Sequence, residues 1–224
     1  MARRPSFDDI LDRLEGQHPN AWTELHFTNP FELLVATILS AQCTDARVNQ
    51  VTPLVFAKYP TPAALARATP EDLEPIVQPT GFFRVKARSL IGMAQKVVAQ
   101  HGGEIPSDMA DLTALPGVGR KTANVVRGHA FGIPGLPVDR HVLRVANRIG
   151  LIHTDDAVAA ETALGAGLAP ARWTRASDTL ILHGRRVCRP KPLCDRCQVK
   201  LDCDYFRNLG AKTRKVKKTR KVKS

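Results

Sequence analysis

Four cysteines near the C-terminal end restrict the fold of this chain more than any other feature. They are spaced C-x5-C-x2-C-x5-C, at Cys188, Cys194, Cys197 and Cys203. Four thiolates within 16 residues can close around one centre, and in an intracellular chain such a cluster indicates metal rather than disulfides. Structural zinc sites usually pair two C-x2-C knuckles, whereas this segment has one, so the spacing leaves zinc and an iron–sulfur cluster equally open.

Helix signals fill most of the remaining sequence. Thr69-Pro70-Glu71-Asp72 combines a capping hydroxyl, proline at the first helical position and acids in the first turn. Convincing two-residue alternation, which is typical of strands, is missing. We therefore expect an all-α fold. Its predicted helices begin at Thr61 and Thr69 or cover about 31–42, 82–100, 107–114, 120–131, 139–149, 155–168 and 172–184.

The composition suits one large or two small domains. Hydrophobic residues make up 43% of the 224 positions, but no stretch approaches the ~18–20 apolar residues of a membrane span. The N-terminus lacks the apolar run of a secretory signal. We expect a soluble, cytoplasmic protein, with the Pro/Gly-rich stretch 132–138 as the best candidate for a domain boundary.

Positive charge is concentrated at the C-terminal end. The net charge is +12, but residues 207–224 hold nine Lys or Arg and no acid, and the rest of the chain carries only +3. The sequence TRKVK occurs twice there, at 213–217 and 219–223. We expect this tail to be disordered and to attract polyanions without specificity. A solubilising segment would look the same, so the tail alone does not establish nucleic-acid binding.

The segment 112–125, LTALPGVGRKTANV, predicts two helices joined by a tight turn. Gly117 and Gly119 permit positive φ and remove the Cβ atoms that would block a close approach. The turn leads into a helix N-terminus, whose N–H groups and positive dipole end favour a phosphate. An ordinary helix–helix turn needs only one glycine, so the pattern favours a phosphate site.

Lys121 lies in the first turn of the second predicted helix. The helix dipole disfavours a cation there and favours the free amine, and burial or the neighbouring Arg120 or Arg127 would act in the same direction. A neutral amine can attack an electrophilic sugar carbon and hold it as a Schiff base. From position alone, however, a solvated lysine that touches a phosphate is the better explanation.

Asp139 follows Pro137-Val138 and is expected to cap the helix that runs to Ile149. A capping carboxylate at the lip of a cleft could also stabilise a developing oxocarbenium ion and help to move protons. The plain cap is the simpler interpretation, but the two roles do not compete.

Taken together, these motifs resemble bacterial endonuclease III, a bifunctional DNA glycosylase and abasic-site lyase with a helix-hairpin-helix. The resemblance covers about residues 5–206. It rests on SAQCTD (40–45), GFFRVKA (81–87), LPGVGRKTANVV (115–126), VDRHVLRVANR (138–148), LILHGR (180–185) and the four cysteines.

The resemblance implies two helical lobes with the active cleft between them. A six-helix domain would cover 23–133 and contain the hairpin 112–125. An iron–sulfur cluster domain would combine residues 1–22 with 134–206, and the basic tail 207–224 would follow. The family's cofactor is a [4Fe-4S] cluster, which decides between iron and zinc for the four cysteines. The implied partner is double-stranded DNA with oxidised pyrimidines or abasic sites, bound by a nucleoid-associated monomer.

The site residues are carried over motif by motif. Lys121 matches the family's Schiff-base lysine, Asp139 its catalytic aspartate and Asp45 a second cleft carboxylate. Gln42 and Phe82 match the residues that fill the hole and wedge the duplex when a base is flipped. Taken singly, Gln42 would be a polar residue at a helix end and Phe82 a core aromatic. Further DNA contacts are expected from Gly117, Val118, Gly119, Arg120, His141 and Arg144.

The chain departs from the family pattern at three places. The gap between Cys188 and Cys194 is one residue shorter than the usual six. Phe82 stands where an aliphatic wedge is common. Arg140, beside Asp139, replaces the usual threonine, and we expect this extra cation to change rate and substrate range.

Two other functions remain to be weighed. A monofunctional adenine glycosylase lacks a lysine at position 121, carries a glutamate in the early buried helix where this chain reads Val35-Ala36-Thr37-Ile38, and needs a further C-terminal domain. A non-enzymatic DNA-binding module would use only the hairpin and the tail, and it leaves the combination of Lys121, Asp139 and four cysteines unexplained.

Overall fold

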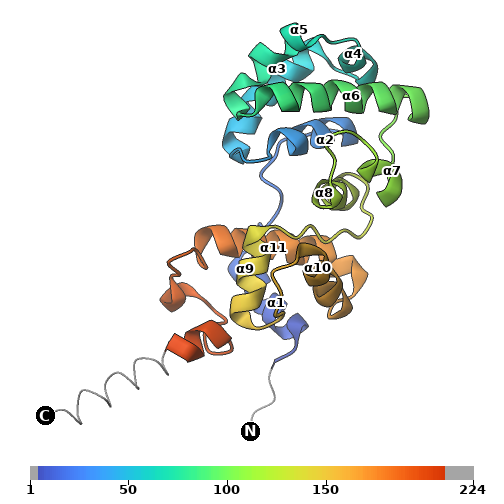
Figure 1. Ribbon diagram of the computed structural model, residues 1–224. Coiled ribbons are helices and arrows are strands. Elements are labelled where there is room, and N and C mark those ends of the chain that lie inside the picture. Colours follow the sequence, from blue (N-terminus) through green and yellow to red (C-terminus); the bar gives the residue numbers. More distant parts are fainter. Residues whose placement is uncertain (1–4, 210–224) are drawn as a thin grey trace, which may run out of the picture. The chain divides into compact units, whose positions relative to one another are not determined.

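The computed structural model describes residues 5–209, which form helices and connecting loops (Figure 1). No residue in that range lies in a strand, so the predicted all-α fold class is confirmed. None of the helices in the described range is long and apolar enough to cross a membrane.

The chain divides into two compact units. One is Thr23–Pro137, which we call the hairpin unit; the other, the cysteine unit, contains residues up to Trp22 and from Val138 onward. The sequence placed the second boundary four residues earlier, after residue 133. Gly135 explains the difference, because a Cβ atom there would lie 2.4 Å from the backbone oxygen of Asn124. The segment that follows the hairpin therefore packs back onto the hairpin unit.

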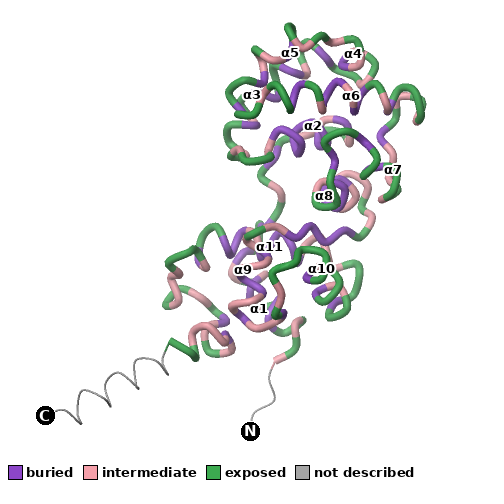
Figure 2. The backbone as a smooth tube through the Cα atoms, in the orientation of Figure 1, coloured by how far each residue is buried: buried purple, intermediate pink, exposed green. Residues whose placement is uncertain are grey.

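The hairpin unit is built around α2 (Pro30–Leu39), in which eight residues are buried; Figure 2 shows this helix largely in the buried colour. It contacts α3 (Asp45–Lys58), α6 (Phe83–His101) and α8 (Arg120–Ala130). The short helices α4 (Pro62–Ala66) and α5 (Pro70–Val77) pack on α6, and α7 (Met109–Thr113) packs on α8. A 3-10 turn, η1 (Gln78–Thr80), precedes α6.

The expected caps at Thr61 and Thr69 are present. Their hydroxyls accept hydrogen bonds from the backbone N–H groups three residues later, over 3.2 and 3.3 Å. Helix α3 was not predicted, because Pro53 interrupts its pattern. It begins behind another capping threonine, Thr44, whose hydroxyl accepts from Arg47 N–H.

The predicted helix over 31–42 ends three residues early, at Leu39. The side-chain ammonium of Lys86 donates a hydrogen bond to the Leu39 carbonyl over 2.8 Å. Ser40 turns its hydroxyl back to the Thr37 carbonyl over 2.8 Å. The chain then leaves the helix, and Gln42 adopts a left-handed φ of 53°. The Ser-Ala-Gln-Cys segment is therefore a turn rather than the last turn of a helix.

The cysteine unit contains α1 (Phe7–Gln17), α9 (Arg140–Ile149), α10 (Ala157–Ala166), η2 (Pro170–Arg172), α11 (Trp173–Arg186) and η3 (Cys194–Arg196). Helix α11 packs on α9 and α1. Gly184 permits the close approach to α9, since a Cβ atom there would lie 2.9 Å from that of His141. Residues 204–209 are helical, so the start of the predicted tail is ordered. Its remainder, 210–224, lies outside the described residues.

Candidate functional site

The predicted hairpin is present between α7 and α8. Gly117 has a φ of 77°, and a Cβ atom there would lie 2.7 Å from the Cβ of Ser89. The turn is closed by a 3.1 Å hydrogen bond from Val118 N–H to the Leu115 carbonyl. Gly119, by contrast, has no heavy atom within 4 Å of an added Cβ. The first glycine is thus needed for the fold, and the second leaves the backbone open to a ligand.

Helix α8 begins without a side-chain cap, with Gly119 as its N-cap residue. The first intrahelical bond is Ala123 N–H to the Gly119 carbonyl, over 3.0 Å. N–H groups in a first turn have no carbonyl partner within their own helix, and the dipole end there is positive. The side chain of Val118 is buried, so only its backbone is placed to contact DNA. This geometry suits a phosphate group.

Lys121 is exposed on the first turn of α8. The sequence allows burial of Lys121, but the structure does not bury this residue. Arg127 is not an i+3 or i+4 neighbour either, so it lies on another part of the helix surface. Lys121 follows Arg120 directly at the N-terminal end of α8.

Gln42 and Phe82 share an unusual backbone conformation. They are the two non-glycine residues with positive φ among those described, at 53° and 49°. Both are exposed, and 65% of the Phe82 surface is accessible, so this residue is not a core aromatic. Asp45 is half-buried and opens α3, three residues after Gln42. Strained, exposed residues of this kind concentrate at functional sites.

Asp139 caps α9 as predicted. One carboxylate oxygen, Oδ1, accepts hydrogen bonds from the backbone N–H groups of His141 and Val142 over 2.7 and 2.9 Å. The side chain is only half-buried, which is compatible with a second role. Arg140 is exposed at the first position of the helix.

His141 and Arg144, the other two polar residues expected on α9, are half-buried. Burial lowers the pKa of His141, against the opposing effect of Asp139. The guanidinium of Arg144 donates to the carbonyls of Cys188 and Gly184 over 3.1 and 2.9 Å, and it lies 3.0 Å from Nδ1 of His141. Arg144 therefore ties α9 to α11 and the cysteine segment, and its predicted DNA contact stays a prediction.

The four cysteines line one cavity in the cysteine unit. Among the described residues, no group of three or more His, Cys, Asp or Glu side chains lies close enough to hold a single metal ion. Burial raises the pKa of the Cys194 and Cys203 thiols, and that of Cys197 to about 11. Thiols in this setting ionise when a bound cation compensates the charge. Four sulfur donors around one shared cavity fit a metal-binding segment.

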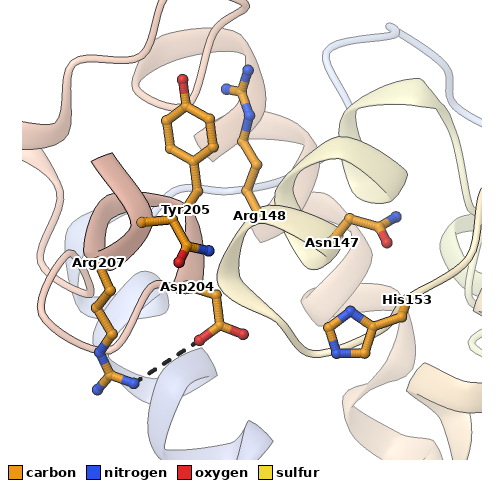
Figure 3. Close-up of a pocket in the computed structure, with 7 residues that line it drawn as sticks. Asn147, Arg148, His153, Asp204, Tyr205 and Arg207 are labelled. Carbon is orange, nitrogen blue, oxygen red and sulfur yellow. Dashed lines mark ion pairs between the residues drawn. The ribbon is translucent and has the colours of Figure 1, made fainter. Parts of the chain in front are cut away.

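Arg148 organises the segment that carries the cysteines, a role that the sequence did not reveal. Its guanidinium donates to the carbonyls of Arg189 and Pro190 over 2.7 and 3.0 Å, and it lies 3.5 Å from Cys188 Sγ. Cys203 Sγ donates to the backbone carbonyl of Arg148 over 3.1 Å. Figure 3 shows the guanidinium beside the Tyr205 ring, 4.6 Å from its centroid.

The chain matches known proteins over most of its length. Residues 35–170 match the family described as HhH-GPD superfamily base excision DNA repair protein. Endonuclease III of Synechocystis sp. is 47% identical, over 85% of this chain and 88% of that protein.

Two solved structures agree with this. A non-covalent endonuclease III–DNA complex has a TM-score of 0.88 at 38% identity, covering 94% of this chain and all of that one. A trapped endonuclease III–DNA covalent intermediate gives 0.87 at 39% identity, with 93% and 99% coverage. The helical fold, the two-glycine hairpin and these matches show that the chain belongs to the endonuclease III family of base-excision DNA repair enzymes.

Proposed function

We propose that this protein removes oxidised pyrimidines from double-stranded DNA and then cuts the strand 3′ to the resulting abasic site. The observation that carries the proposal is the placement of Lys121, exposed on the first turn of α8, directly after the Gly117–Gly119 turn. A phosphate bound at that turn would bring the sugar of the same strand within reach of the lysine amine. Asp139, which caps α9, belongs to the cysteine unit.

The chemistry starts with the lone pair on Lys121 Nζ. It attacks C1′ of the flipped nucleotide, the C1′–N bond breaks, and the base leaves with the bonding pair and takes up a proton. Asp139 stabilises the positive charge that develops on the sugar and accepts the proton released by the amine. The nitrogen lone pair then forms a C=N bond to C1′ while O4′ leaves with the electron pair of the C1′–O4′ bond and takes up the proton held by Asp139, which gives the Schiff base between Lys121 and C1′.

The same intermediate leads to strand cleavage. The Schiff base withdraws electrons from C2′, a proton leaves C2′, and the C3′–O bond breaks with departure of the 3′ phosphate. Water then hydrolyses the imine and regenerates the amine. Lys121 therefore serves both reactions, which is why one residue gives both glycosylase and lyase activity.

The remaining expected residues bind and shape the DNA. The turn at Gly117, Val118 and Gly119, with Arg120, holds the phosphate, whereas Gln42 and Phe82 enter the duplex at the lesion. Asp45, His141 and Arg144 are proposed as further contacts in the site. A monomer of this kind, working along the nucleoid, needs no partner other than damaged duplex DNA.

We further propose that Cys188, Cys194, Cys197 and Cys203 hold a [4Fe-4S] cluster. The support is the shared cavity that all four cysteines line, in a chain that belongs to the endonuclease III family. When bound, the cluster would hold the four thiolates at one centre and so fix the loop between α11 and the helical residues 204–209. Arg148 and Arg144 prepare that loop through its carbonyl groups.

Borohydride trapping tests the nucleophile. Incubation of the protein with duplex DNA containing thymine glycol, in the presence of borohydride, reduces the Schiff base and should leave a covalent protein–DNA complex. Lys121→Ala should abolish trapping. Lys58→Ala, which removes an exposed lysine paired with Asp72 on another part of the hairpin unit, should trap like the wild type. No complex with the wild type, or full trapping by Lys121→Ala, would defeat the assignment.

A further inference from the structure

Lys86 is a lysine in an unusual place. It lies in the first turns of α6, yet only 5% of its surface is accessible. Burying an ammonium group is costly unless hydrogen bonds replace its water, and burial lowers the pKa of this lysine. The ammonium group of Lys86 therefore needs hydrogen-bond partners in place of water.

The ammonium has two backbone partners. Lys86 Nζ donates to the carbonyl of Leu39 over 2.8 Å and to that of Thr80 over 2.7 Å. Leu39 is the last residue of α2, and Thr80 is the last residue of η1. The negative dipole end of α2 adds to the attraction for a cation. One side chain thus joins the C-terminal ends of two helical elements that lie far apart in the sequence.

The two loops that leave these ends carry the strained residues. Gln42 follows Leu39 by three positions, and Phe82 follows Thr80 by two; both have positive φ and both are exposed. Backbone strain of this kind persists only where the surrounding structure enforces it. The Lys86 ammonium binds the carbonyl group from which each of the two loops departs.

We propose that Lys86 is a positioning residue that sets the spacing between the Gln42 and Phe82 loops, so that both side chains enter one lesion site together. The inference rests on the proposed function, in which these two residues replace a flipped base. The phosphate contacts proposed at the Gly117–Gly119 turn do not involve Lys86. Its loss should therefore affect recognition of a lesion and leave binding to undamaged DNA largely intact.

The test compares two duplexes of the same sequence, one undamaged and one with a tetrahydrofuran abasic analogue that cannot be cleaved. Fluorescence anisotropy gives a Kd for each, and their ratio measures discrimination. Lys86→Met keeps the aliphatic stem and removes the ammonium. We expect it to lower discrimination roughly tenfold or more, as for loss of charge-assisted hydrogen bonds, with a change of less than about twofold for undamaged DNA.

A matched control separates positioning from stability. Val97→Ala removes a fully buried side chain from the same helix, away from both loops, and should lower the unfolding midpoint without changing discrimination. A spectroscopic measurement adds a local view. 2-Aminopurine opposite the abasic analogue should brighten when the wild type unstacks it, and should brighten much less with Lys86→Met. If Lys86→Met does not fold, Lys86→Gln takes its place; it keeps a neutral donor on a shorter side chain, so a smaller selective loss of discrimination is expected, again without loss of binding to undamaged DNA.

The outcomes are distinct. Unchanged discrimination in Lys86→Met, or an equal loss on both duplexes, would overturn the positioning role while borohydride trapping by the wild type still supports the proposed function. Failure of the wild type to trap would remove the proposed function and this inference with it. A selective loss of discrimination and of the 2-aminopurine signal, absent in Val97→Ala, supports the inference.

Discussion

Replacement of Gly117 by alanine tests the hairpin most directly, because two separate costs can be worked out for it. The residue has a φ of 77°, and left-handed backbone costs an alanine about 1–2 kcal/mol. The new Cβ would also lie 2.7 Å from the Cβ of Ser89, and forcing an extra carbon into a packed contact costs about 1–3 kcal/mol. Gly117→Ala should therefore lower the free energy of unfolding by about 2–5 kcal/mol.

Gly119→Ala is the matched control, two residues away in the same turn. Its φ of −93° suits any residue, and an added Cβ meets nothing within 4 Å. The expected loss of stability is at most about 1 kcal/mol, the difference between glycine and alanine at an N-cap. Because the Cβ would project into the space where the phosphate is proposed to bind, this variant should nevertheless weaken DNA binding.

Urea-induced unfolding, followed by helical circular dichroism, measures the stability of both variants. Combination of Gly117→Ala with Ser89→Gly removes the steric cost and leaves the backbone cost, so the pair should show a coupling of about 1–3 kcal/mol relative to the single changes. If Gly117→Ala were no more destabilising than Gly119→Ala, or if the pair were additive, the steric account of the hairpin would be refuted.

Three further results are expected. Asp139→Asn should keep the α9 cap, since an Asn oxygen accepts the same two N–H bonds, and its stability should stay within about 0.5 kcal/mol of the wild type. Its rate of base excision should nevertheless fall by about 100-fold or more. Parallel losses of stability and rate would contradict this. Cys197→Ser should remove the visible absorption of an iron–sulfur cluster, whereas Cys43→Ser, at the cysteine outside the cavity, should keep it; iron analysis of both proteins checks the result. Burial, and to a smaller extent Arg186, lower the pKa of His18 below its ordinary 6.5, so the unfolded chain binds the proton more readily than the folded one. The free energy of unfolding should therefore fall as pH drops below about 6.5. In His18→Gln, the free energy of unfolding measured over the same pH range should fall less.

Local sequence signals predicted the parts of the fold that depend on a few adjacent residues. Asp139 and Thr69 form the caps expected of them, and Gly117 adopts the positive φ that its turn required. Each of these features is determined within four or five positions, where capping and turn chemistry act. Helix α1 was overlooked, although Ser6 and Asp9 form a capping box at its start.

Features that depend on long-range contacts could not be predicted in this way. The helix pattern continued through Gln42, but α2 stops at Leu39, where Lys86, 47 residues later, takes the carbonyl. Arg148 binds carbonyl groups more than 40 residues away, and the sequence adjacent to Arg148 does not predict these contacts. A sequence pattern ordinarily places lysine and arginine on the surface. It therefore does not reveal when the charged end of such a side chain binds backbone carbonyl groups far away in the sequence.

The same comparison shows why Gln42 and Phe82 need the rest of the molecule. Their residue types alone suggested a polar helix end and a core aromatic, and the structure makes both exposed and left-handed. Such a conformation is unfavourable for an isolated loop, so it has to be held by contacts from elsewhere in the unit. Lys86 binds the carbonyl group that precedes each loop. Under the proposed function, insertion of both side chains at one lesion would therefore depend on Lys86, a buried residue of α6.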